Sequence, residues 1–315
     1  MKPALVPISR RVRAYCAPVD RATETPTSFD PTVAFNFDVP AAPWFALGDV
    51  ANLKRTGATK VAPLVSGSKG AVAAQFRTTL DATVAFDFLQ WGKIQMALSG
   101  GSQHMNVLAT NGASGPDTGN PACSPVAVLA GSTATELVVG TGAVDALNVG
   151  DMIACDIDYA QQTGYVGSPA AAYVKDPADV NRDRDYLRRV TFNVARVASK
   201  TSTALQLDQP LLGGDPGLGA QIQKVVAFAD REGGSFFQEW SLLLTLEPES
   251  GGRTCFYYPR VQACSPASEA GITCDTYKTS TLHAELIALP VQDSIDGEQV
   301  ACWRTYFPAS GADLY

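Results

Sequence analysis

The sequence predicts a mainly β protein, an α+β body dominated by antiparallel sheet with one flanking helix. Three observations lead to this prediction. Long stretches alternate apolar and polar residues, one stretch changes from period two to the period of a helix, and Gly- and Pro-rich turns separate the segments. Of the 315 residues, 46% are hydrophobic and 17% are charged, which is enough apolar content for a sizeable core in two or three modules.

The clearest element is a strand over residues 75–88 that runs into a helix over residues 89–99. Even positions of the strand are mainly apolar and odd positions are mainly polar, as in a strand with one buried face. The helical spacing then begins, and Gly100-Gly101 ends it. We expect one apolar face of this segment to form a helix–sheet core, made of Phe76, Leu80, Val84, Phe86, Phe88, Trp91, Ile94 and Leu98.

The remaining chain divides at its turns. The first 40 residues predict an extended arm that ends in a short strand, TVAFNFDVP, and residues 41–70 predict loops and turns. We expect a body made of residues 1–110 and 220–315, the latter with long alternating strands. Residues 123–212 predict an inserted small β-barrel-like module.

The charge distribution argues against a nucleic-acid-binding protein. Residues 1–104 carry +4, residues 105–225 carry −4 and residues 226–315 carry −7, which sum to the net charge of −7. Phosphate binding needs a concentrated basic face, which this balance does not provide. One basic cluster in the N-terminal arm either contacts an acidic neighbour or is solvated: Arg10, Arg11, Arg13 and Arg21. We expect no transmembrane helix and no secretory signal, because long apolar runs are missing.

No motif of an enzyme or a metal site stands out, so we predict no catalytic residue, no metal and no cofactor. The chain has two histidines, and HExxH, GxSxG and the phosphate-binding loop are absent. GTGAVD at 140–145 lacks the third glycine of a dinucleotide fingerprint, and the acidic stretch 179–185 lacks the glycine and the glutamate of a calcium loop. We interpret His283 as a surface histidine, the FYYP run at 256–259 as sheet packing, and the seven cysteines mainly as buried free thiols.

The segment FRTTLDATVAFDFLQWGKIQMALSGG, a long amphipathic strand entering a helix that ends in glycines, resembles part of the bacteriophage major tail proteins, which form the tail tube. FFQEWSLLLTLEPESGGRTCFYYPRVQA, TSTLHAELIALP and CWRTYFPA resemble the strands with which such subunits close. The likeness covers roughly residues 70–110 and 235–308 and includes no diagnostic motif. The 123–212 segment is similar to the accessory β modules of some tail proteins.

The resemblance implies a β-sandwich subunit flanked by a helix, six copies of which close into a ring. The rings stack into a tube in the virion tail, assembled in the host cytoplasm beside other tail proteins, and DNA passes without specific binding. The polar strand face would line the channel, with Gln75, Thr79, Asp81, Thr83 and Asp87, and the arginines of the arm would contact the next ring. A 14-residue strand fits a closed barrel better than a monomer, where its edges would be exposed.

Two alternatives stay open beside this hypothesis. The tube of a contractile injection system shares the fold and is not distinguished by sequence. A monomeric carbohydrate-binding or adhesive β-sandwich module would need exposed aromatic residues on one sheet face, and the best candidates are Tyr257, Tyr258 and Trp303. An enzyme ranks third, because no convergent set of acid, base, nucleophile or metal ligand is evident.

Overall fold

A computed structural model describes most of the chain. It covers residues 9–19, 24–41, 43–66, 71–90, 92–101, 103–108, 125–156, 194–211, 214–231, 239–249, 251–264, 268–270 and 281–309. The chain divides into two compact units. Unit 1 comprises Met1–Gly101 and Phe237–Tyr315, and unit 2 comprises Ser102–Phe236.

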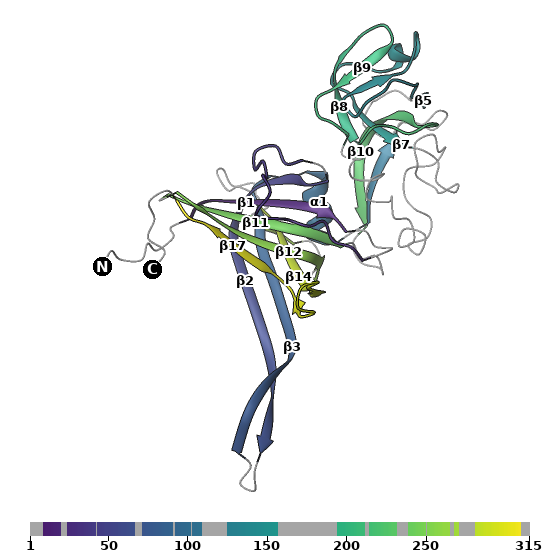
Figure 1. The fold of residues 1–315 in the computed structure, drawn as a ribbon. Helices are drawn as coiled ribbons and strands as arrows, with labels where there is room; N and C mark the ends of the chain where they lie inside the picture. Colours follow the sequence, from purple (N-terminus) through teal and green to yellow (C-terminus); the bar gives the residue numbers. More distant parts are fainter. Residues whose placement is uncertain are drawn as a thin grey trace. The chain divides into compact units, whose positions relative to one another are not determined.

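Unit 1 is built on one antiparallel sheet that curls on itself (Figure 1). Its eight strands follow the order β13-β14-β3-β2-β1-β11-β12-β17. A further pairing between β14 and β12, through residues 286–289 and 260–263, joins six of the strands into a closed circuit. The bounds are β1 Ser9–Pro18, β2 Phe45–Ser66, β3 Ala71–Phe88, β11 Trp240–Pro248, β12 Arg253–Ala263, β13 Ser268–Ala270, β14 Thr281–Leu289 and β17 Trp303–Phe307. The predicted fold class, mainly β with antiparallel sheets, is confirmed.

The strand period explains which side chains enter the core of unit 1. Along β14, alternate residues from Leu282 to Ala288 are buried, while the residues between them are half-buried. On β3, Val84, Phe86 and Phe88 are fully buried, and the last two rings contact edge to face. The inner end of β3 therefore has one buried face, as its alternation predicts.

The outer face of β1, β11 and β12 is covered by irregular chain, which we call the cover segment (residues 24–41 and 43–44). Phe29, Phe35 and Trp44 of this segment pack with Tyr15 and Tyr257 of the sheet. The prediction of an extended N-terminal arm is wrong, because residues 9–18 form β1 between two other strands. The prediction of a strand at TVAFNFDVP is also wrong. Its aromatic residues pack onto a sheet instead of pairing in one.

One short α-helix is present in the described residues, α1 (Lys93–Gly100), beside β14 and β12. Ser99 donates a hydrogen bond to the carbonyl of His283, and Gln95 donates one to the carbonyl of Leu47 at 3.1 Å. The helix begins later than the predicted residue 89, because Gly92 is still extended. Gly101 ends it with a φ of 55°, and a Cβ there would lie 2.7 Å from Ala263 Cβ. A glycine is required at this close approach.

Unit 2 contains a small antiparallel sheet with its own core. Its strand order is β4-β10-β7-β8-β9-β6, with β5 paired to β10. The core includes Leu137, Leu147, Ile153, Leu205 and Ile222, all fully buried. The expected insert, residues 123–212, is narrower than this unit, because β4 and β10 pair with each other outside it. The bounds are β4 Gln103–Leu108, β5 Val126–Ala127, β6 Glu136–Val138, η1 Ala143–Ala146, β7 Met152–Asp156, β8 Val194–Lys200, β9 Ala204–Leu207 and β10 Gln221–Arg231.

A short hairpin completes the described strands, formed by β15 (Val291–Gln292) and β16 (Gln299–Val300) in unit 1. Its turn is acidic, with Asp293, Asp296 and Glu298. No helix among the described residues is both long and apolar enough to cross a membrane.

Candidate functional site: the projecting hairpin

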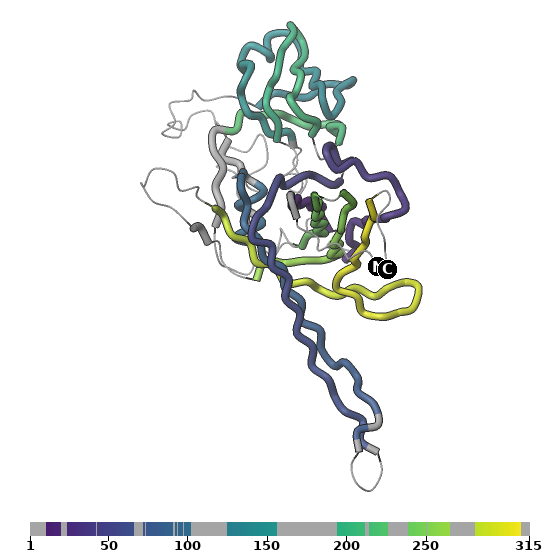
Figure 2. The backbone as a smooth tube through the Cα atoms, turned by 90° about the vertical axis from the view of Figure 1, so that its left-hand side faces the viewer, coloured from purple at the N-terminus to yellow at the C-terminus, as the bar shows by residue number. Residues whose placement is uncertain are grey.

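β2 and β3 form a hairpin that continues well beyond the neighbouring strands of unit 1 (Figure 2). β1 pairs with β2 at residues 45–49, and β14 pairs with β3 at residues 82–88. Beyond these residues, in the part of the chain that the structure describes, β2 and β3 pair only with each other. We call residues 54–66 and 71–81 the projecting hairpin.

The projecting hairpin presents two strand edges without a partner. Its eleven residues of β3 span roughly 36 Å at about 3.3 Å per residue. An isolated two-stranded hairpin is marginally stable in water, and a long free edge is a template for pairing with another chain. The projecting hairpin therefore has two edges that are available for pairing with another strand.

A β-bulge at Thr78 changes which side chains share a face. Lys60 pairs with Thr79, but Val61 pairs with Arg77, so Thr78 is left over, and its hydroxyl donates to the carbonyl of Lys60 at 3.1 Å. Residues opposite each other in a ladder lie on the same face. The extra residue therefore moves Phe76 onto the face that carries Thr79, away from the face of Val84.

The predicted helix–sheet core is thus split in two. Leu80, at the inner end of the projecting hairpin, and Ile94 are half-buried, whereas Val84, Phe86, Phe88 and Leu98 are buried. The prediction is wrong for Phe76, which is 57% exposed on the projecting hairpin. Trp91 lies outside the described residues. The physical reason is the bulge together with the lack of a third strand at this level of the hairpin.

Large apolar side chains are exposed on both faces of the projecting hairpin. Their exposed fractions are 53% for Val61, 51% for Leu64, 53% for Val65, 56% for Val72 and 57% for Phe76. The pairing register places Leu64 and Phe76 on one face and the three valines on the other. Contiguous exposed apolar side chains mark interaction sites in soluble proteins.

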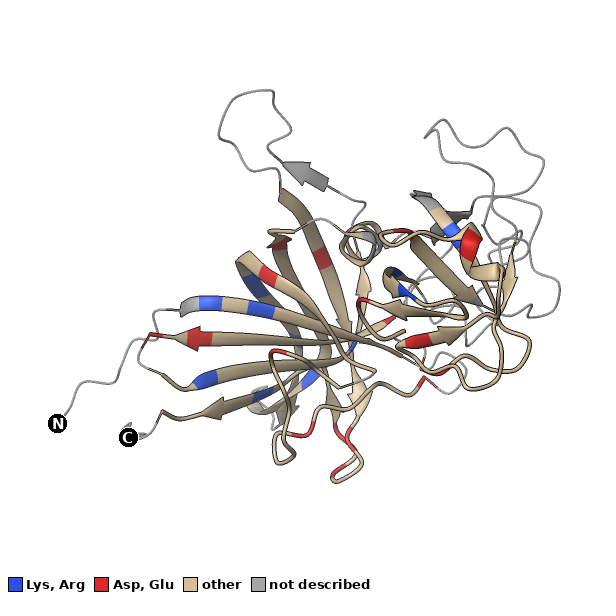
Figure 3. Cartoon of the chain, turned by 90° about the horizontal axis from the view of Figure 1, so that it is seen from above, with Lys and Arg blue, Asp and Glu red and all other residues tan. Residues whose placement is uncertain are grey.

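The residues predicted to line a channel do not form one acidic face. Gln75, Thr79 and Asp81 are exposed on the projecting hairpin, but the bulge places Gln75 on the opposite face from the other two. Lys60 lies opposite Thr79, so basic and acidic side chains share that face. Seen from above (Figure 3), basic and acidic residues are likewise interleaved over the strands of unit 1.

Thr83 and Asp87 lie in the body, where both are half-buried. The carboxylate of Asp87 is engaged in contacts within unit 1 and does not line a channel wall as a solvated group. It accepts a hydrogen bond from Asn52 Nδ2 at 2.7 Å and lies 2.7 Å from Nδ1 of His283, its cross-strand partner on β14. His283 is therefore more than a solvated surface histidine, because it pairs with a carboxylate that is only 16% exposed.

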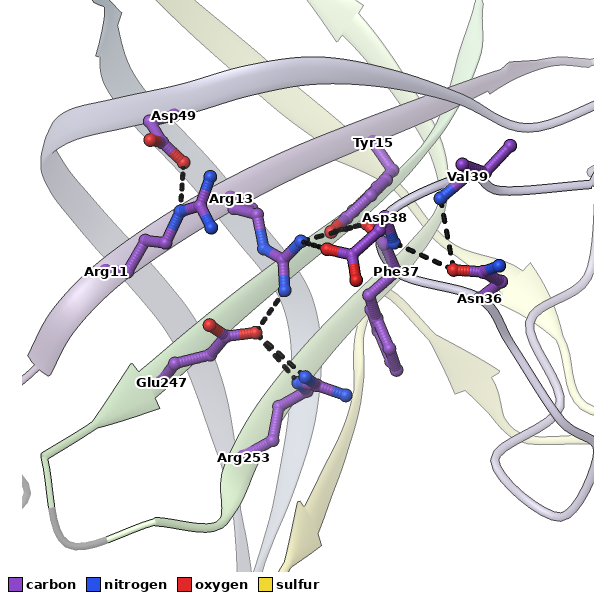
Figure 4. Close-up of polar contacts among 10 residues, drawn as sticks. All are labelled: Arg11, Arg13, Tyr15, Asn36, Phe37, Asp38, Val39, Asp49, Glu247 and Arg253. Atoms are coloured by element: carbon purple, nitrogen blue, oxygen red, sulfur yellow. Dashed lines mark hydrogen bonds and ion pairs between the residues drawn. The ribbon is translucent and has the colours of Figure 1, made fainter.

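Of the arginines assigned to an inter-ring arm, Arg13 instead helps to hold the cover segment in place (Figure 4). Arg13 is buried, and its guanidinium donates to Asp38, to the carbonyl of Phe37 and to Glu247. Arg253 donates to the same oxygen of Glu247 and lies 3.7 Å from the centre of the Phe37 ring. Burial acts to raise the pKa of Glu247, but the hydrogen bonds from both arginines outweigh it and hold the pKa below its usual value.

The inter-ring prediction is therefore wrong for Arg13. Arg11 pairs with Asp49 at 2.6 Å on the neighbouring strand. The backbone of Arg10 belongs to β1, and Arg21 lies outside the described residues. Arg13 can be buried because the cover segment and β11 supply it with the carboxylates of Asp38 and Glu247. The cluster of arginines in the sequence does not reveal these distant partners.

The other sequence expectations have mixed outcomes. Tyr257 and Tyr258 are buried, which confirms sheet packing for FYYP. Cys16 and Cys255 are buried free thiols, as expected, whereas Cys264 is exposed. GTGAVD forms a turn and the 3-10 helix η1, and the acidic stretch 179–185 lies outside the described residues. Among the described residues, no group of three His, Cys, Asp or Glu side chains has the geometry of a metal site.

Sequence reasoning missed the strand that carries half of the site. Residues 41–70 were expected to be loops and turns, but residues 45–66 form β2, the longest strand in the described chain. Its Gly57 and Pro63 are typical of turns, yet both are tolerated in a strand whose second edge is unpaired. Comparison with known proteins adds no family: no family model matches the chain, and no curated protein matches it.

Proposed function

We propose that this protein is a structural subunit that polymerises into closed rings, which stack into a phage tail tube through which DNA passes. One observation carries the proposal: the projecting hairpin exposes five large apolar side chains and two unpaired strand edges. A monomer gains nothing from such an element and risks aggregation. In a closed ring, each hairpin edge pairs with a strand of the adjacent subunit, and closure removes all the edges.

The curled sheet of unit 1 supports the same proposal, because it gives the hairpin a stable base. The inner ends of β2 and β3 belong to the six-strand circuit and its buried core. Assembly then adds strands to a sheet that already exists, so a subunit does not need to fold anew to join a ring. The resemblance of residues 70–110 and 235–308 to tail tube subunits points in the same direction.

The charges of the projecting hairpin bear on the passage of DNA without specific binding. The projecting hairpin carries Lys54, Arg55, Lys60 and Arg77 against Asp81, so it is not the acidic wall that its β3 residues alone suggested. The net charge of −7 and the interleaved basic and acidic residues of unit 1 support the view that the protein attracts phosphates only weakly. This part of the proposal otherwise depends on the resemblance.

No observation favours the carbohydrate-binding or adhesive module. That function needs aromatic rings exposed together on one face, and the three candidate residues do not supply them. Tyr257 and Tyr258 are buried, and Trp303 packs against Tyr257 with ring centres 5.9 Å apart. These rings belong to the core and to the cluster under the cover segment.

Negative-stain electron microscopy of the purified protein, with light scattering over a concentration series, tests the proposal. We expect rings or hollow tubes with a central channel, and a particle mass that rises with concentration. Tube formation sometimes needs an initiating assembly, so the series is repeated with preformed short tubes as seeds. A monomer at every concentration, with and without seeds, would contradict the proposal.

A further inference from the structure

Arg55, near the base of the projecting hairpin, contacts the far wall of the unit 1 sheet. Its Nε donates to the hydroxyl of Tyr258 on β12 at 2.6 Å. Its guanidinium carbon lies 3.9 Å from the centre of the Phe256 ring, also on β12. Its Nη2 lies 3.3 Å from Sγ of Cys302. One side chain thus joins the hairpin to three residues of the body.

The topology makes this contact unusual. In the six-strand circuit, β2 and β12 are separated by two strands in either direction, so they lie opposite each other. Arg55 pairs with the fully buried Val84, which places it on the inner face of β2. Phe256 and Tyr258 alternate with Cys255 and Tyr257, which face the cover segment. The contact therefore crosses the inside of the sheet at the level where the hairpin leaves it.

The chemistry of this contact differs from that of an ion pair. Among the described residues Arg55 forms no salt bridge, and its partners are a phenol, an aromatic face and a thiol. Burial raises the pKa of Tyr258 to about 12, although the hydrogen bond from Arg55 acts to lower it. The hydroxyl therefore stays neutral and accepts the hydrogen bond. Arginine suits such a site because its planar guanidinium can stack on an aromatic ring and donate hydrogen bonds at the same time.

A second anchor holds the opposite face of the hairpin base. Asn52, in left-handed backbone conformation with a φ of 53°, donates to Asp87, which also pairs with His283 of β14. This anchor lies on the outer face, and the Arg55 contact lies on the inner face. Two anchors on opposite faces restrict bending of the hairpin in both directions.

We propose that Arg55 is a positioning residue that sets the direction in which the projecting hairpin leaves the sheet, so that its free edges meet the adjacent subunit. The effect on assembly depends on the proposed function, whereas the effect on hairpin direction does not. Without the contact, the hairpin bends more easily where it leaves the sheet, because at the level of Arg55 only β14 supports it, on the β3 side, and β2 has no further partner strand.

The experiment measures hairpin direction and assembly separately. Nitroxide-bearing amino acids are introduced at Gln75 on the hairpin and at Asp296 in the β15–β16 turn, and their distance distribution is recorded by pulsed electron resonance. The labelled chain is diluted in excess unlabelled protein, which suppresses distances between subunits. The variants are Arg55→Gln, Arg55→Lys and Tyr258→Phe. Lys54→Gln is the matched control, because Lys54 is the adjacent exposed cation and pairs with Ala85 on the outer face.

We expect Arg55→Gln to broaden the distance distribution and to raise the concentration needed for assembly about tenfold. Tyr258→Phe should broaden the distance distribution less than Arg55→Gln does, because the contact of the Arg55 guanidinium with the Phe256 ring remains. The width for Arg55→Lys should lie between those of Tyr258→Phe and Arg55→Gln. Lys54→Gln should match the wild type, whereas Arg55→Gln and Tyr258→Phe lose a hydrogen bond of the buried Tyr258 and should melt at a lower temperature while staying folded at the temperature of the measurement. A narrow distribution in Arg55→Gln, or equal broadening in Lys54→Gln, would overturn the proposal.

The two proposals fail in different ways. If the wild type forms no rings but Arg55→Gln still broadens the distribution, the assembly function is wrong and the positioning role of Arg55 stands. If the wild type forms rings and Arg55→Gln keeps the narrow distribution, the positioning role is wrong and the assembly function stands.

Discussion

The double substitution Leu64→Ser with Phe76→Ser tests whether the apolar surface of the projecting hairpin drives association. The two side chains share one face and are 51% and 57% exposed. Complete burial of a large apolar side chain is worth about 1.5–3 kcal/mol, so burying the remaining half is worth about 1 kcal/mol. The pair should therefore contribute about 2 kcal/mol to each interface that covers this face, or about 30-fold in its association constant.

The same double variant should leave the subunit itself almost unchanged. Both side chains are already exposed, and surface substitutions of this kind usually change the free energy of unfolding by less than about 0.5 kcal/mol. Phe86→Ala, by contrast, removes a fully buried ring of β3 and should cost about 3–5 kcal/mol. Urea unfolding followed by tryptophan fluorescence separates these two effects.

Sedimentation velocity over a concentration series, with electron microscopy of each sample, measures the association. The matched control is Val39→Ser with Ile295→Ser, which removes two exposed apolar side chains of unit 1 away from the hairpin, 72% and 92% exposed. The control should assemble at the wild-type concentration. The reasoning is refuted if the hairpin variant also assembles at that concentration, or if the control shifts as far as the hairpin variant does.

Three further predictions concern the body of unit 1. Asp81→Arg should leave the free energy of unfolding within about 0.5 kcal/mol of the wild type, whereas Asp87→Arg should lower it by about 1–3 kcal/mol in urea, because its hydrogen-bond partners are left unpaired. The hydrogen bonds from Arg13 and Arg253 hold the folded pKa of Glu247 below its ordinary value of 4.5, so its contribution to stability is present above that pH and is lost as the pH falls through the folded pKa. Glu247→Gln should therefore flatten the loss of urea stability on acidification below about pH 4.5. Ser241→Ala should lower the melting temperature, because it removes about 1–3 kcal/mol of the free energy of unfolding. The fully buried Ser241 hydroxyl accepts a hydrogen bond from the amide of Thr27 at 2.9 Å and donates one to the carbonyl of Pro259 at 2.8 Å. Each argument is contradicted by its own measurement: an unchanged free energy of unfolding in Asp87→Arg, an unchanged acid dependence in Glu247→Gln, an unchanged melting temperature in Ser241→Ala, or a destabilised Asp81→Arg.

Alternation along the chain predicted the strands that have one buried face. β14 is the clearest case, because its buried and half-buried residues follow a strict period of two. The inner end of β3 follows the same rule from Val84 to Phe88. Where a third strand and a core are present, hydrophobic pattern and burial agree, because removal of apolar area from water selects the register.

The same reasoning failed for the cover segment and for β2. Phe29, Phe35 and Phe37 alternate with other residues like part of a strand, but they pack as irregular chain on a sheet face that is made elsewhere in the sequence. β2 has no consistent apolar face, because much of it lies beyond the core of unit 1. Local pattern reports burial, so it does not reveal a strand that continues beyond the core of its own unit.

The bulge at Thr78 decides how the candidate site should be tested. Counting odd and even positions treats Phe76 and Val84 as one face, and then every polar odd residue belongs to a single channel wall. The pairing register separates these residues, so a variant that combines Gln75 with Thr79 alters both faces at once. Substitutions that share a face isolate one surface at a time: Leu64 with Phe76 on the face of Thr79, or Val65 with its cross-strand partner Val72 on the opposite face. Which of the two pairs impairs assembly would show which face of the projecting hairpin meets the adjacent subunit, and the other face would then be the candidate for the channel wall.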